Sequence, residues 1–157
     1  MPDPDRIALT FRLGKPEDLP SVADAVAAHQ DIVQTYGKVA LGKTGRALST
    51  TTIDRAIAPE HPTLLIITRA GQYFHAYTAP IHEILSHPQA PQEKLIPQYY
   101  RHLQYAIHTW MILGQITSLP QEILESTALC SNHRLLLNVL RSTRTTNMLV
   151  RLGDPVS

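Results

Sequence analysis

The segment Gly37–Thr44 carries two glycines, a lysine and a threonine at the spacing of a phosphate-binding P-loop. A P-loop holds phosphates with backbone amides in a flexible turn between a buried strand and a helix. Here the preceding residues have a helical pattern, and the residues between Gly37 and Gly42 are largely apolar. A P-loop-like nucleotide-binding enzyme that uses Lys43 and Thr44 is therefore kept as an alternative hypothesis.

Aromatic side chains offer a second kind of chemistry, the stacking of a nucleic-acid base. They concentrate at 73–77, at Tyr99 and Tyr100, and at Trp110. Stacking on an aromatic ring contributes about 1–3 kcal/mol per base, which can offset the cost of extruding that base from a duplex. The same residues are equally suited to packing in a core, and Trp110 in particular lies among strand-forming residues.

Other reactive residue types lack the spacing that metal binding or catalysis needs. His82 and His87 are five residues apart, so a helix would place them about 140° apart rather than on one face. Cys130 is the single cysteine, which excludes an internal disulfide framework and a multi-thiolate zinc site. We expect no cofactor, no metal site and no enzymatic activity in this chain.

Net charge is close to balanced, with 14 Lys and Arg against 13 Asp and Glu. The charge is unevenly distributed, however. Residues 1–31 hold six acids and three bases, residues 37–55 four bases and one acid, and residues 126–153 four bases and no acid. The total excludes a polycation that binds nucleic acid nonspecifically, and we expect the two basic segments to share one face of the fold.

Hydrophobic periodicity predicts an α+β chain that forms a single domain over residues 1–157. Alternation predicts strands, and a spacing near 3.6 residues predicts helices. The expected strands are 7–13, 38–41, 63–68, 72–78, 108–116 and 148–152, and the expected helices are 17–36, 49–57, 120–124 and one that Asn132 caps before Leu135–Leu140. Irregular interleaving of these elements favours a curved mixed β-sheet or a small β-barrel flanked by helices.

Compartment signals point to the cytoplasm. The chain has one cysteine, no apolar run near the ~18 residues of a membrane span, and an N-terminus rich in proline and aspartate rather than a signal peptide. We therefore expect a cytoplasmic protein with no membrane partner.

The order of several short pieces resembles the EVE and YTH branch of the PUA-like superfamily, including the N-terminal specificity domains of Mcr-type, modification-dependent restriction systems. The pieces are Tyr36–Lys43, Leu64–Ile67 followed by Tyr73–Tyr77, Ile96–Arg101, Thr109–Leu113 and Ser142–Asn147. The resemblance implies a small curved sheet or barrel that flips a nucleobase, often methylated, into an aromatic cage while basic loops hold the backbone.

The same resemblance implies which residues would act. The base pocket would be lined by Ala40, Leu41, Gly42, His75, Tyr99, Tyr100 and Trp110. Contacts to the nucleic-acid backbone would come from Lys38, Lys43, Arg46, Arg101, Arg141, Arg144 and Asn147. Related domains tend to carry a tryptophan on the first strand of the pocket, where this chain has Ala40 and Leu41.

The sequence thus predicts a binding domain for a modified base, in DNA rather than RNA, within a restriction or defence system. Any nuclease or NTPase activity would belong to another domain or subunit. Besides the P-loop enzyme, one further alternative is a protein-interaction module that has kept the fold and lost the pocket.

Overall fold

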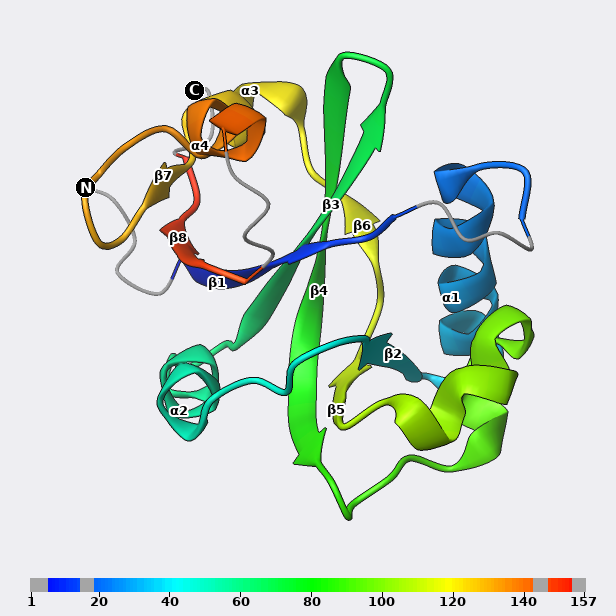
Figure 1. Cartoon of the computed structure of the whole chain (residues 1–157). Coiled ribbons are helices and arrows are strands. Elements are labelled where there is room, and N and C mark those ends of the chain that lie inside the picture. Colours follow the sequence, from blue (N-terminus) through cyan, green and yellow to red (C-terminus); the bar gives the residue numbers. More distant parts are fainter. Residues whose placement is uncertain (1–5, 15–18, 143–146, 154–157) are drawn as a thin grey trace.

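The computed structural model describes residues 6–14, 19–142 and 147–153, which form an α+β structure around a mixed sheet of eight strands (Figure 1). The strands are β1 (Ile7–Arg12), β2 (Val39–Lys43), β3 (Thr63–Ala70), β4 (Tyr73–Ser86), β5 (Thr109–Leu113), β6 (Thr117–Ser118), β7 (Ala128–Leu129) and β8 (Leu149–Arg151). The helices are α1 (Val22–Tyr36), α2 (Thr50–Ile57), α3 (Gln121–Glu125) and α4 (Leu136–Ser142), with the 3-10 segments η1 (Glu93–Leu95) and η2 (Gln98–Ala106).

The sheet is open and mixed. Its strand order is β2-β5-β4-β3-β1-β8-β7, and the short β6 pairs with β4 beside this path. The strands β1 and β3 run parallel, and the other neighbours are antiparallel. No ladder joins β2 to β7 in the part of the chain that the structure describes, so the expected mixed sheet is confirmed and a closed barrel is not formed.

Local signals explain where the two longer N-terminal helices begin and end. The Ser21 hydroxyl caps α1 by accepting from the Asp24 N–H, and Gly37 ends the helix at a φ of 81°. Ser49 caps α2 in the same way through the Thr52 N–H. The predicted cap at Asn132 is wrong, because that side chain accepts from the Arg134 N–H in a turn and α4 begins only at Leu136.

The hairpin of β3 and β4 is confirmed, and it is longer than the sequence indicates. Gly71, at a φ of 63°, lies in the turn that joins Ala70 to its partner Tyr73. The strand β4 then continues through Pro80 to Ser86. Proline lacks an N–H but keeps its carbonyl, and the Pro80 oxygen accepts a hydrogen bond from the Gly114 N–H at 2.9 Å. The strand therefore continues through a residue type that usually interrupts strands.

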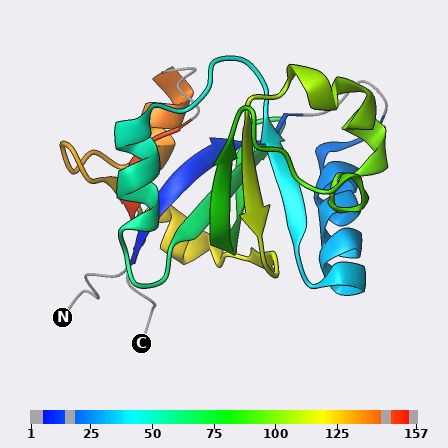
Figure 2. The same cartoon turned by 90° about the horizontal axis from the view of Figure 1, so that it is seen from below.

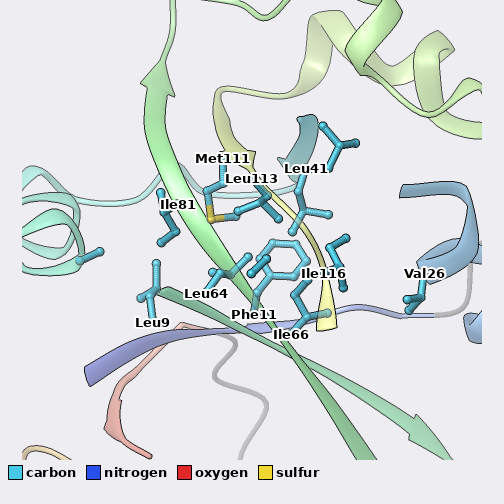
Figure 3. Close-up of a cluster of buried hydrophobic side chains, with 13 residues drawn as sticks. Leu9, Phe11, Val26, Leu41, Leu64, Ile66, Ile81, Met111, Leu113 and Ile116 are labelled. Atoms are coloured by element: carbon cyan, nitrogen blue, oxygen red, sulfur yellow. The ribbon is translucent and has the colours of Figure 1, made fainter. Parts of the chain in front are cut away.

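Three packed clusters bury the apolar side chains. The first lies on the sheet and includes Leu9, Leu64 and Met111 (Figure 3). The second packs α3 and α4 against the opposite face of β1, β3, β4 and β8. Because side chains alternate along a strand, β5 contributes Met111 and Leu113 to the first cluster and Trp110 and Ile112 to the third, which also holds Tyr100 of η2.

Truncation of a side chain in the first cluster should be costly. Leu64 is fully buried, so Leu64→Ala should lower the free energy of unfolding by about 2–5 kcal/mol, through lost burial and the cavity it leaves. Urea denaturation measures the change. The matched control is Leu135→Ala, the same truncation at a side chain that is 44% exposed, and an equal loss in both variants would contradict this account of the core.

Candidate nucleic-acid interface

Three strands end or begin at the same level of the sheet, and the loops that leave them carry the site. Thr109 at the start of β5 pairs with Lys43 at the end of β2 and with Ser86 at the end of β4. Figure 2 shows the loop after β2 and the segment η2 along the same side of the molecule, at the upper edge of that view. The strand ends therefore bring together loops that are distant in sequence.

These loops are rich in basic residues, and their one carboxylate between residues 84 and 110 is Glu93 in η1. Residues 38–53, 84–92 and 94–110 include no Asp or Glu. At this level of the sheet they supply a set that we call the basic end: Lys43, Arg46, Arg101, His87, His102 and His108. A surface with one sign of charge attracts a polyanion.

Two contacts fix the shape of the basic end. The Lys43 ammonium donates to the backbone carbonyls of Arg46 and Thr44, which holds the loop after β2, and partial burial lowers the pKa of Lys43. The His87 N–H donates to the His108 carbonyl at 2.8 Å, and the two imidazole rings meet edge to face with centroids 5.2 Å apart. Arg46, His87 and His108 are exposed and available to a ligand.

Beside the basic end, η2 packs on the free edge of β2 through Tyr100. The Tyr100 hydroxyl lies 2.8 Å from the Ala40 carbonyl and 3.0 Å from Nε2 of His29 in α1, while Nδ1 of His29 lies 2.8 Å from the Ala25 carbonyl. Burial lowers the pKa of His29 to about 4, against the opposing effect of the Ala25 hydrogen bond. Hydrogen-bonding groups of the strand edge are thus covered by a side chain instead of another strand.

Aromatic rings gather around Tyr100. Its ring is nearly parallel to those of Trp110 and His29, at centroid distances of 6.2 and 5.7 Å, and meets Tyr99 edge to face at 4.7 Å. Trp110 is fully buried, whereas Tyr99 is half-buried, and desolvation raises the pKa of Tyr99 to about 12. The structure therefore brings together Ala40, Gly42, Tyr99, Tyr100 and Trp110, as the resemblance implies.

The expected open pocket at these residues is a packed cluster in this state. A Cβ built on Gly42 would lie 2.7 Å from Cδ1 of Ile107 and 2.8 Å from Cζ3 of Trp110, so the space beside β2 is already filled. The residues that were expected to line a pocket wall, Ala40 and Trp110, have no exposed surface to offer a ligand. Tyr99 is the aromatic residue of this group that remains accessible.

Two predicted pocket residues lie elsewhere. Leu41 faces the first core cluster, because neighbouring residues on β2 point to opposite sides of the sheet. His75 is exposed near the hairpin turn, eleven residues before the end of β4, which is roughly 35 Å along an extended strand. Both placements follow from strand register, which the sequence alone did not establish.

The two basic segments do not share one site. Lys38 lies before the first residue of β2, at the opposite end of that strand from Lys43. Arg141 lies in α4, which packs beneath β8, and five strand spacings of ~4.8 Å separate β2 from β8. Asn147 donates to the Thr10 carbonyl and so binds the C-terminal segment to β1, while Arg144 lies outside the described residues.

The Gly37–Thr44 segment does not have P-loop geometry. Residues Val39–Lys43 form β2 and pair with β5 over their whole length, so their amides follow a sheet ladder instead of a turn around a phosphate. Helix α1 precedes the motif, and α2 begins only at Thr50. The letters match the motif, but the surrounding elements do not.

Sequence reasoning missed His29 as part of the site. The signal was present: His29 follows Ala25 by four residues on the apolar side of α1, where a buried histidine needs polar partners. Its partner Tyr100 is 71 residues away, and only the fold reveals that pairing. The His87–His108 contact was likewise hidden, because it joins the two ends of a long connection.

No protein-family model, curated protein or solved structure matches this chain. In the part of the chain that the structure describes, no group of three or more His, Cys, Asp or Glu residues could hold a metal ion, and no helix is long and apolar enough to cross a membrane.

The close packing at Gly42 gives a direct test. Gly42→Ala should lower the free energy of unfolding by about 1–3 kcal/mol, because the new methyl group must displace Ile107 and Trp110. Urea denaturation with Trp110 emission measures it. The control is Gly14→Ala, where an added Cβ meets nothing within 4 Å; a similar loss at both positions would show that the space beside Gly42 is not filled.

Acid should destabilise the fold through His29. Its pKa is about 4 in the folded protein against an ordinary 6.5, so between these values the unfolded chain binds a proton that the folded chain does not, and stability falls as the pH falls. Between pH 7 and pH 5 the free energy of unfolding should fall about 2 kcal/mol more in the wild type than in His29→Gln. Equal losses in urea titrations of the two proteins would contradict this origin.

Proposed function

We propose that this chain is a nucleic-acid-binding domain of the EVE/YTH type within the PUA-like superfamily, which recognises a modified base in DNA for a restriction or defence system. The observation that carries the proposal is the basic end, where three strand ends and their loops bring basic residues together. Cleavage or translocation would be performed by another domain or subunit.

Phosphate contacts account for the binding energy in this proposal. Arg46 and Arg101 supply permanent charges, and His87, His102 and His108 add donors around them. Arg101 is positioned by its own hydrogen bond, since its Nε donates to the Ile96 carbonyl at 2.9 Å, which leaves the terminal nitrogens of the guanidinium for a ligand. Arginine suits phosphate oxygens because its nitrogens donate in pairs.

Base recognition would use the aromatic group next to these cations. Tyr99 is accessible, lies beside Tyr100, and belongs to the same short segment as Arg101. Tyr105, at 89% exposure, adds a second aromatic ring on η2. An aromatic ring beside a cation that contacts the nucleic-acid backbone is the arrangement that holds an extruded base.

Binding to duplex DNA at increasing salt concentrations tests the role of the basic end. Arg46→Ala should weaken binding about 3- to 10-fold and reduce the slope of log affinity against log salt by about one, since one phosphate contact is lost. The control is Arg141→Ala, an exposed arginine near the opposite edge of the sheet, which should leave both quantities unchanged. Equal effects of the two substitutions would overturn this assignment.

A panel of duplexes that carry N6-methyladenine, 5-methylcytosine or no modification tests base recognition. The proposal expects one modified duplex to bind more tightly than the unmodified one. It also expects Tyr99→Ala to reduce that preference, because stacking on the ring contributes about 1–3 kcal/mol per base. Equal affinity for all duplexes would overturn base recognition, and affinity without salt dependence would favour a protein-interaction module.

A further inference from the structure

Tyr100 is the side chain that anchors η2 to the sheet. It is the buried residue of this nine-residue segment, whereas His102, Leu103 and Tyr105 are exposed. It also lies at a break between two 3-10 turns, where its φ of −127° and ψ of 18° depart from helical values. The buried Ile96 and Ile107 hold the two ends of the segment, so Tyr100 can leave the sheet at the backbone break without disturbing a continuous helix.

The ring of Tyr100 occupies the kind of space that a base would need. It lies nearly parallel to the buried indole of Trp110, with 19° between the two planes, and within 29° of the His29 ring. Its hydroxyl reaches the backbone of β2 at the Ala40 carbonyl, and the Gly42 N–H points to the same free edge of the strand. A planar group beside an indole, with its polar edge on a backbone donor and acceptor, is how a bound base would be held.

The hydrogen bonds that would hold Tyr100 need one more proton than the groups around it supply. Three contacts link the Ala25 carbonyl, the two ring nitrogens of His29, the Tyr100 hydroxyl and the Ala40 carbonyl. The two carbonyls only accept, so three hydrogen bonds need three protons, whereas a neutral imidazole and a phenol supply two. Burial disfavours the extra proton on His29 and keeps the Tyr100 phenol protonated. One close contact therefore joins two lone pairs, which weakens the closed arrangement.

We propose that Tyr100 acts as an internal occupant of the base site, and that nucleic acid binds to a state in which Tyr100 has left Trp110 and the edge of β2. This inference rests on the proposed function and adds how the site is controlled. The base must displace Tyr100, so the affinity for a base is reduced by the stability of the closed state.

The exposed edge of β2 also defines the class of base. After Tyr100 leaves, the Ala40 carbonyl accepts and the Gly42 N–H donates at adjacent positions, because alternate residues of β2 face its free edge. The matching base edge offers an N–H next to an acceptor, as the exocyclic amine and the ring nitrogen of adenine and cytosine do. N6-Methyladenine keeps one such N–H, and 5-methylcytosine keeps both groups, so either modification is compatible with this edge.

The chain contains a single tryptophan, so Trp110 reports the opening of the site without any ligand. Acrylamide quenching of its emission should be weak in the wild type and stronger in Tyr100→Phe, which loses the hydroxyl and its contacts. In His29→Gln, whose amide supplies the missing donor, quenching should be weaker than in the wild type. The matched control is Tyr73→Phe, at an exposed tyrosine beside the β3–β4 turn. Far-UV circular dichroism confirms that each variant is folded. Equal quenching in all four proteins would overturn the proposal.

Binding of the same duplex panel gives the second readout. Tyr100→Phe should bind about 3- to 10-fold more tightly than the wild type, because one hydrogen-bonded group no longer holds the closed state. His29→Gln should bind more weakly, and Tyr73→Phe should bind like the wild type. If Tyr100→Phe bound equally or more weakly, Tyr100 would be a wall of the site, and the proposal would be wrong.

The two readouts separate the two ideas. If no variant binds any duplex but quenching follows the expected order, the proposed function fails and the closed state of Tyr100 stands. If the duplexes bind with the salt dependence described above but Tyr100→Phe changes neither quenching nor affinity, the proposed function stands. The proposal that Tyr100 occupies the base site is then overturned.

Discussion

The free edge of β2 is the constraint on which this part of the molecule depends. An edge strand exposes backbone donors and acceptors that need partners once they are removed from water. Here the partner is a phenol, held between a strand carbonyl and a buried histidine. That choice determines the position of η2, the burial of Trp110 and the low pKa of His29.

The arrangement also explains how the proposed binding site would share its place with a packed cluster. A rigid core is stabilised by close-packed apolar contacts, all of which are lost if the core opens. The cluster around Tyr100 instead contains polar contacts that cannot all be satisfied at once. Such a group is stable enough to define the closed state and weak enough to exchange one planar partner for another.

Local structure was largely readable from the sequence, and long-range placement was not. Alternation over 7–13, the glycine after Tyr36 and the serine at 49 indicate β1, the end of α1 and the start of α2, whereas the start of α1 was expected at residue 17 and lies at Val22. The position of His75 depends on how far β4 continues, and the separation of Lys43 from Arg141 depends on strand order. The grouping of Tyr99, Tyr100 and Trp110 came from a family resemblance, while their burial required the fold.

The pairing of β1 with β8 has a consequence for how the protein forms during synthesis. Leu9 lies opposite Leu149, 140 residues further along the chain, while β1 also runs parallel to β3. Contacts this distant in sequence carry a large loop-closure entropy and make folding slow. On the ribosome, the β3–β4 hairpin can form early, but the edge of β1 that pairs with β8 stays unpaired until β8 has been synthesised. The incomplete sheet then exposes an unpaired strand that chaperones can bind.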